Sequence, residues 1–382
     1  MASSAAEYAS SLFTLPTGSD NDLTNVIRGE QLNRAVQNKD PFVNFMGPDM
    51  AEQSDPESPP DAWYPFVKKT ELEKGSGDQI IVPYVENLSY TLFKHGADDL
   101  AATTSVQKIA FSGHRVFLVN SRTGAGYKNQ AMSEQRNRHL SKATAEMLLT
   151  DVMAQRQAYE KMYALVNGYS SNVVAEVTSA AVISHPSANT FYGSPSATSD
   201  NAVTNTDTLT WKLMQRMENW IIKNNIKPCK MENGETGYVL FVPPYSIYDL
   251  GRDADWISAQ NNAFNSKGYE SPIFKTAEGR GPGNIFVHAT NYTQNPASTV
   301  GDYTKKWYCI LMGSHALSCA YGKSPQIFPN LNNDFFNLAE WSIDAIFGFA
   351  RTERVSDDGN TTYTNQSSSR WTVWAEDPNA AP

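Results

Sequence analysis

The clearest periodic pattern in the chain is a helical one between residues 133 and 167. Ser133 and Glu134 suit the N-terminus of a helix, and Gly168 suits its end. At 1.5 Å per residue the predicted helix is about 50 Å long, so we interpret it as a strut across a flat body. Its apolar residues recur at steps of three and four, on one face: Leu140, Met147, Leu148, Val152, Tyr159, Met162, Tyr163 and Val166.

Two stretches before this helix have the pattern of strands. Residues 79–84 read as a short buried strand, and residues 108–120 alternate with period two, with a bulge expected at Gly113. The alternation puts an apolar group and a polar group on opposite faces of the second strand. The apolar group is Ile109, Phe111, Phe117 and Val119, and the polar group is Lys108, Ser112, His114 and Asn120.

The connection between these two strands is long and apolar. It contains Tyr90 and Phe93, and it far exceeds the usual hairpin loop of two to five residues. We therefore predict a projecting hairpin over residues 86–107 whose side chains Tyr90 and Phe93 pack on an adjacent subunit. The alternative is that they fold back on their own chain.

The second half of the chain mixes helices and strands, which predicts a compact α+β unit. A helix is expected over 208–225, with the apolar stripe Leu209, Leu213, Met217, Trp220 and Ile221. A second helix, around Trp256, is expected over 249–264. Strands are expected at 237–242, 284–288, 307–312, 343–347 and 370–374. Phe349 and Trp371 are interpreted as hairpin partners across a polar turn at 356–366, and residues 169–207 as a polar excursion with some strand in 173–182.

Residues 1–66 are too irregular to build a core of their own. Prolines interrupt residues 55–60, so neither a helix nor a central strand fits there. Aromatic residues lie among the turn residues of this arm. We expect it to lie on this chain's body or on a neighbour's, with the anchors Phe42, Phe45, Trp63 and Tyr64.

Composition favours a folded protein that buries much of its surface against partners. Of the 382 residues, 40% are hydrophobic and 11% aromatic, whereas only 19% are charged. The formal net charge of −9 and the lack of any long Lys/Arg run argue against a dedicated nucleic-acid-binding module. No apolar run approaches the roughly 18 residues of a membrane span.

A search for reactive groups yields no catalytic, cofactor or metal site. The three cysteines have no zinc-like spacing, and no two of the six histidines have metal-ligand spacing. The glycine-rich residues 279–283 lack the trailing Gly-Lys-Ser/Thr of a phosphate loop and read as a turn. The carboxylates Asp249, Asp253 and Asp255 are interpreted as a solvated face or a cap.

Three segments carry a resemblance to a known family. They are Gly77-Asp-Gln-Ile-Ile-Val-Pro83, then Met132-Ser-Glu-Gln-Arg136 with the helix that ends Tyr163-Ala-Leu-Val-Asn-Gly168, and Tyr238-Val-Leu-Phe-Val-Pro-Pro-Tyr-Ser-Ile-Tyr-Asp-Leu250. In this order they resemble a podophage-type capsid family, among the major capsid proteins of tailed double-stranded DNA bacteriophages. The resemblance spans roughly residues 40–374.

The resemblance implies an α+β fold, the capsid fold that tailed phages share with herpesviruses. Its parts would be an N-terminal arm (N-arm), an E-loop, a peripheral P-domain with a long spine helix and an axial A-domain. The implied boundaries are N-arm 1–66, P-domain strand 67–85, E-loop 86–107, P-domain 108–207 with spine helix 133–167, A-domain 208–341, and a return to the P-domain with the C-terminal tail at 342–382.

The resemblance also implies a structural function without an enzymatic activity. Copies of the chain would form hexamers and pentamers that close an icosahedral shell around double-stranded DNA, without sequence-specific binding. The implied partners are copies of the chain and portal, scaffolding and decoration proteins, with no membrane and no cofactor. The implied location is the virion shell, assembled in the host bacterial cytoplasm. The alternatives are another virion protein, of the tail or of the decoration class, and a soluble α+β enzyme.

Overall fold

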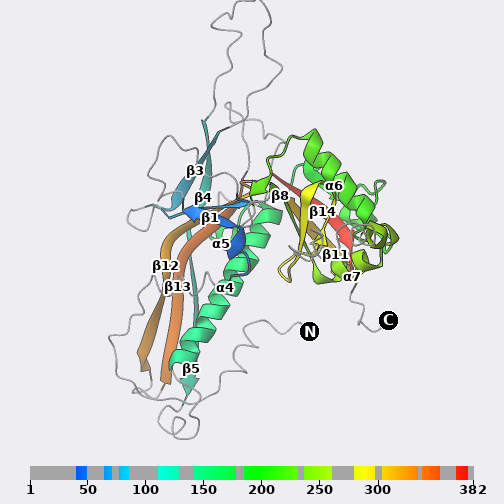
Figure 1. Ribbon diagram of the computed structural model, residues 1–382. Helices are drawn as coiled ribbons and strands as arrows, with labels where there is room; N and C mark the ends of the chain where they lie inside the picture. The colour runs from blue at the N-terminus through cyan, green and yellow to red at the C-terminus, as the bar shows by residue number, and fades with distance from the viewer. Residues whose placement is uncertain are drawn as a thin grey trace, which may run out of the picture.

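The computed structural model describes residues 40–49, 64–70, 77–85, 111–128, 142–177, 182, 185–230, 236–259, 279–296, 303–333, 338–352 and 367–376. These residues form two bodies that lie side by side (Figure 1). One body is elongated and built on long strands, and the other is rounder and built on shorter strands with helices around them.

The elongated body is a five-stranded sheet in the order β1-β2-β12-β13-β5. Its centre is an antiparallel pair of long strands, β12 and β13, on which β2 pairs in parallel and β5 in antiparallel fashion. The strands are β1 (Met46–Asp49), β2 (Phe66–Lys69), β5 (Val119–Lys128), β12 (Leu317–Asn333) and β13 (Leu338–Arg351).

The predicted long helix lies along this sheet as α4 (Lys142–Asn167), and residues 133–141 lie outside the described part (Figure 1). It ends at Gly168, whose φ of +87° few residues other than glycine adopt. The predicted buried face is partly wrong, because Met147 and Val152 are exposed. The predicted Met162 and Val166 are buried, and the rest of the buried face is made by Leu149, Met153, Ala154, Ala158 and Leu165. Small alanines let the helix approach the sheet closely.

Strands β3 (Gln79–Val85) and β4 (Phe111–Phe117) form a separate two-stranded antiparallel sheet. Their register runs without interruption from Gln79↔Phe117 to Val85↔Phe111, so the expected bulge at Gly113 is wrong. The sequence puts Phe117 on the apolar face of β4, and this is also wrong. Val116 and Leu118 are buried, whereas Phe117 is only half-buried. The reason is tertiary: Val116 and Leu118 pack with Ala320 and Ala350 of the long strands.

The rounder body is a seven-stranded sheet in the order β6-β14-β11-β8-β10-β9, with β7 paired to β8. Strands β8 and β10 run in parallel, and β11 is antiparallel to both β8 and β14. The strands are β6 (Thr190–Tyr192), β7 (Cys229–Lys230), β8 (Thr236–Val242), β9 (Gly279–Arg280), β10 (Ile285–Ala289), β11 (Lys306–Met312) and β14 (Ser368–Trp374).

Two helices of the rounder body confirm most of what the sequence predicts. Thr210 is the N-cap of helix α6 (Trp211–Lys223), and its hydroxyl accepts from Leu213 N at 3.3 Å. The whole predicted apolar stripe of this helix is buried. Helix α7 (Pro244–Arg252) starts directly after β8. The helix expected over 249–264 is interrupted at Asp253, whose backbone is extended, and helical residues resume at 254–259.

One long strand was not predicted, and two interpretations of the sequence are wrong. Strand β12, 17 residues long, was not expected. Residues 171–176 form helix α5 (Ser171–Glu176) where some strand was expected. Strands β13 and β14 lie in different sheets, so Phe349 and Trp371 are not hairpin partners. The resemblance implied a boundary between the A-domain and the returning P-domain at residues 341 and 342. Because β12 and β13 lie in the same sheet, this boundary does not coincide with a boundary between sheets.

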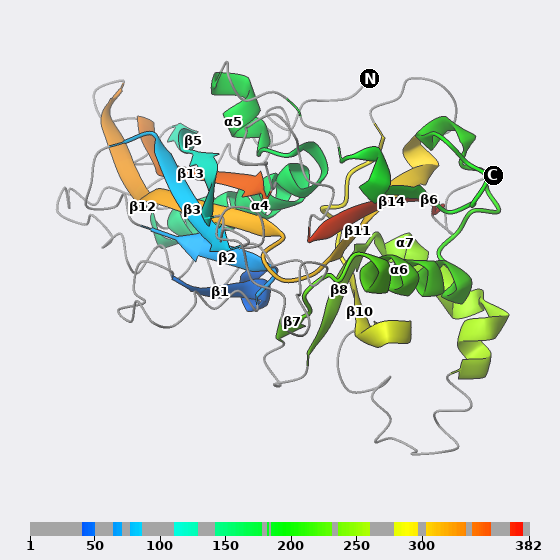
Figure 2. The same cartoon turned by 90° about the horizontal axis from the view of Figure 1, so that it is seen from above.

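One apolar cluster joins the two bodies. It includes Phe347 and Phe349 from the elongated body and Phe241 and Ile310 from the rounder one, with Met162 of α4. Seen from above, β1 and β2 lie toward β8 and β10 at this junction (Figure 2). A second cluster lies within the rounder body, between its sheet and α6.

Candidate functional site

The described residues carry no cluster of side chains suited to metal binding. No group of three or more His, Cys, Asp or Glu side chains converges among them. All three cysteines are buried and free. Burial raises the pKa of Cys319 to about 12 and raises the pKa of Cys229 and Cys309 further, so these thiols stay protonated and unreactive at neutral pH.

The three carboxylates around α7 have separate structural roles. Asp253 accepts from the backbone of Trp211 at 2.6 Å and so caps α6, and Asp255 lies 3.5 Å from Lys212. Burial raises the pKa of Asp249 to about 6. Its Oδ2 is buried and has no hydrogen-bond partner among the described residues, so Asp249 is neither a cap nor a solvated position, whereas Asp253 and Asp255 agree with that interpretation. No helix in the described part of the chain has the length and apolarity of a membrane span.

The start of the described chain is pinned to α4 by a fully buried ion pair. Lys161 donates to Asp40, and both side chains are almost completely shielded from solvent. The second oxygen of Asp40 accepts from Phe42 N at 3.0 Å, and Lys161 also lies over the ring of Phe349, 5.4 Å from its centroid. Breaking such a pair leaves a buried charge without a partner, so residue 40 is held firmly on the helix.

The expected arm anchors Phe42 and Phe45 pack on the chain's own body. Phe42 is buried, with ring centroids 5.0 Å from Phe241 and 6.0 Å from Phe66. Phe45 lies 5.1 Å from Phe241 and 5.0 Å from His288. Tyr64 is half-buried, and its carbonyl accepts from His315 N at 2.8 Å. The expected contacts Trp63, Tyr90 and Phe93 lie outside the described residues.

The C-terminal end of α4 is capped by two basic side chains. Arg351, fully buried, donates to the carbonyls of Leu165 and Val166 at 3.2 and 3.1 Å. His185 Nε2 lies 2.8 Å from the same carbonyl of Leu165. Burial, and then the charge of Arg351, holds the pKa of His185 well below its usual range, so the ring is neutral at neutral pH. The guanidinium compensates the negative end of the helix dipole.

The polar excursion of residues 185–207 is fastened to the rounder sheet through Asp200. Its carboxylate accepts from Thr372 at 2.6 Å and from Tyr308 at 3.1 Å, and it lies 3.6 Å from Arg370. The guanidinium of Arg370 in turn covers the ring of Tyr308, 4.4 Å from its centroid. These contacts hold the polar segment around Asp200 against the seven-stranded sheet.

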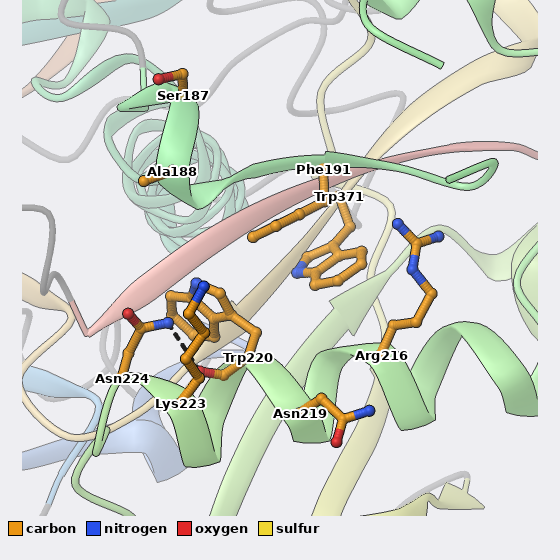
Figure 3. Close-up of a pocket in the computed structure, with 9 residues that line it drawn as sticks. All are labelled: Ser187, Ala188, Phe191, Arg216, Asn219, Trp220, Lys223, Asn224 and Trp371. Atoms are coloured by element: carbon orange, nitrogen blue, oxygen red, sulfur yellow. Dashed lines mark hydrogen bonds between the residues drawn. The ribbon is translucent and has the colours of Figure 1, made fainter. Parts of the chain in front are cut away.

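Between this excursion, α6 and β14 lies a hollow of about 480 Å³ (Figure 3). Phe191 stacks on Trp371 with ring centroids 4.3 Å apart, and Arg216 covers Trp371 at 5.6 Å. Trp220 meets Phe191 edge to face at 6.3 Å. The lining residues are Ser187, Ala188, Phe191, Arg216, Asn219, Trp220, Lys223, Asn224 and Trp371.

Several large apolar side chains are exposed on the described surface. Contiguous apolar patches commonly mark interaction sites, whereas single exposed apolar residues are ordinary. Ile222 of α6 is the most exposed at 65%. The others are Ile81, Met147, Val152, Val182, Tyr248, Ile257 and Phe328.

Sequence reasoning missed the residues that organise these sites. Asp40, Lys161, Asp200 and Arg351 are charged, and a charged residue within an apolar run is normally assigned to the surface. The one signal in the sequence was Arg351 at the end of the apolar stretch from Ile343. Their partners lie more than 100 residues away in the chain, so no local pattern could reveal them.

Comparison with known proteins gives the same family that the sequence segments resemble. Residues 35–370 match the family described as "Phage capsid protein". No curated protein matches the chain.

Solved structures with the same fold include phage capsids. The capsid of Ralstonia phage GP4 matches with a TM-score of 0.65 and 20% identity, over 88% of this chain and 91% of that one. The capsid of cyanophage Pam1 gives 0.62 and 14%, over 87% and 92%. The head of Helicobacter pylori bacteriophage KHP40 gives 0.60 and 14%, over 88% and 91%. At these identities the structures establish the mixed α+β capsid fold alone.

The family match covers most of the chain. The family is one of structural proteins of the virion, so the predictions of a non-enzymatic capsid protein are confirmed. This chain belongs to the phage capsid protein family.

Proposed function

We propose that the chain is a major capsid protein of a tailed phage whose copies associate into hexamers and pentamers. These capsomers close an icosahedral shell around double-stranded DNA. The family match over residues 35–370 is the observation that carries the proposal. The fold shared with phage capsids over 88% of the chain supports it.

The parts of the fold are assigned roles on the same basis. Helix α4 with the five-stranded sheet corresponds to the P-domain and its spine helix, and the seven-stranded sheet with α6 and α7 corresponds to the A-domain. Because β12 pairs with β13, residues 317–341 go with the P-domain, and because β14 pairs with β11, residues 368–374 go with the A-domain. Residues 1–66 are the N-arm and residues 86–107 the E-loop.

Assembly is driven by burial of apolar surface, which contributes about 25 cal/mol per Å². Individually weak contacts let misplaced subunits dissociate, while closure of the shell makes the sum strong. The exposed apolar side chains, among them Ile222 and Ile257, are available for such contacts. Portal, scaffolding and decoration proteins are further partners, and the chain's net charge of −9 fits a shell that encloses DNA without gripping it.

Expression of the chain, alone and with its genomic neighbours, tests this function. Sedimentation and negative-stain microscopy should reveal shells, or free hexamers and pentamers. A monomer of 42.3 kDa in both preparations would contradict the proposal and favour a tail or decoration protein instead.

The E-loop assignment makes a sharper prediction. The double change Tyr90→Ser and Phe93→Ser should abolish particles, because it removes two apolar side chains that we assign to a contact on the adjacent subunit. The unfolding midpoint of the monomer in urea should stay within the error of the unchanged chain. Particles in normal yield from the double variant would refute the contact, and a lowered midpoint would indicate that both residues fold back on their own chain.

A further inference from the structure

The segment that connects the elongated body to the rounder one is fastened to both within a few residues. His185 Nε2 lies 2.8 Å from the carbonyl oxygen of Leu165, near the C-terminal end of α4. Shortly after it, β6 pairs in parallel with β14, and Gly193 N donates to Thr372 O at 2.9 Å. Residues 185–193 therefore form a strap between α4 and the seven-stranded sheet.

The ring of His185 occupies a position that suits only its neutral form. The side chain is 5% exposed, and because Nε2 lies against a carbonyl oxygen, that nitrogen carries the hydrogen and donates it. The other ring nitrogen, Nδ1, is buried without a hydrogen-bond partner among the described residues. A proton added at Nδ1 would therefore create a buried cation whose second N–H group has no acceptor there.

The charged groups that act on this ring are both basic, and they come from two different sheets. Arg351, at the end of β13, donates to the carbonyl of Leu165 at 3.2 Å and so shares an acceptor with His185. Arg370 of β14 lies 3.6 Å from Asp200. Burial, then the charge of Arg351 and more weakly that of Arg370, lowers the pKa of His185, and only the hydrogen bond to Leu165 acts in the opposite direction.

We propose that His185 is an acid-sensitive latch for the strap. The neutral ring holds residues 185–193 between α4 and β14, and protonation of the ring releases them. Release separates Phe191 from Trp371, whose ring centroids lie 4.3 Å apart, and uncovers the edge of β14 (Figure 3). Among the described residues, none of the strap belongs to the apolar cluster that joins the two bodies, so the bodies stay together.

Release of the strap takes up a proton, which sets the direction of the pH dependence. In the attached strap the pKa of His185 is depressed, whereas in the released strap the ring is in water and its pKa returns to the ordinary value of about 6.5. Attachment is therefore fully present above about pH 6.5 and weakens as the pH falls toward the depressed pKa. Since one proton is bound on release, the opening constant should rise about tenfold per pH unit in that window.

Hydrogen exchange of the full chain, measured by mass spectrometry from about pH 7 to about pH 4 and corrected for intrinsic exchange rates, tests the latch. A peptide of residues 187–194 should lose protection about tenfold per pH unit below about pH 6.5, while a peptide from α6 keeps its protection. His185→Gln keeps an N–H donor for Leu165 but cannot take up a proton, so its strap should show no such loss. The matched control His288→Gln removes a half-buried histidine that lies 5.0 Å from Phe45, and it should leave the acid response intact.

Constant protection of the strap down to about pH 4 overturns the proposal, as does an equal acid-induced loss in His185→Gln. Simultaneous loss of protection in the strap and in α6 means that the protein unfolds as a whole, which also overturns it. If His185→Gln does not fold, the unchanged chain still decides the question, because its strap must open at a higher pH than α6 and with the slope of one proton.

Discussion

At the residue scale, buried charged side chains hold distant segments of the chain together. Glu160, fully buried, accepts from the backbone and hydroxyl of Ser171 at the start of α5 and pairs with Arg156. The next residue of the helix, Lys161, pairs with Asp40. A buried charge is tolerated only when its partner and its hydrogen bonds are present. These residues therefore specify where α5 and the arm attach.

Replacing Lys161 by Met should lower the free energy of unfolding by about 3–5 kcal/mol, because Asp40 would remain buried without its partner. Urea denaturation followed by circular dichroism measures the change. The double variant Lys161→Met with Asp40→Leu should recover a large part of the loss, since no charge is then stranded.

Lys212→Met is the matched surface control. Its ammonium is largely exposed and lies 3.5 Å from Asp255, so the loss should stay below about 1 kcal/mol. If Lys161→Met proved as mild as this control, the buried pair would not hold the arm in the way we infer.

At the scale of elements, close backbone approach decides how strands cross. In β13, a Cβ added at Gly348 would lie 1.8 Å from the carbonyl oxygen of Phe117, at the end of β4. Only glycine allows β13 to pass this close to the junction of β4 and β5. The position thus ties the two-stranded sheet to the long strands.

Gly348→Ala should therefore destabilise the protein by about 3 kcal/mol or more, because backbone must shift to remove the clash. Gly251→Ala, near the end of α7, meets nothing within 4 Å and should stabilise by up to about 1 kcal/mol. Thermal unfolding of the two variants measures both signs. Equal effects of the two substitutions would contradict the close approach.

At the scale of the whole molecule, the two sheets share one core and should unfold together. Phe241 of the rounder sheet packs with Phe42 and Phe66, which adjoin the elongated sheet. A shared apolar cluster couples the stability of the parts that contribute to it.

Phe241→Ala should cost about 3–5 kcal/mol and raise hydrogen exchange in both α4 and α6, as seen by mass spectrometry of their peptides. The exposed Ile222→Ala is the control and should change neither. Faster exchange in α6 with an unchanged α4 would mean that the two bodies unfold independently.

Local pattern determined most of the individual elements. Helices α4 and α6 and strands β3, β8, β10 and β11 were predictable, because their apolar periodicity is strong and their ends carry Gly, Pro or capping residues. The absence of reactive motifs, together with three family-like segments, also indicated the family.

Tertiary structure alone decided how these elements combine. Strand β12 carries Pro325, Pro329 and several polar residues, so its sequence does not read as a strand, and long-range pairing with β13 and β2 makes it one. The sheet to which β14 belongs is likewise set by pairing with β11.

The same holds for the sites. Asp40 with Lys161, and the hollow formed by Phe191, Trp220 and Trp371, join residues far apart in sequence. The physical reason is that periodicity reports which face of an element is apolar, whereas the partner of that face is chosen by packing across the whole chain.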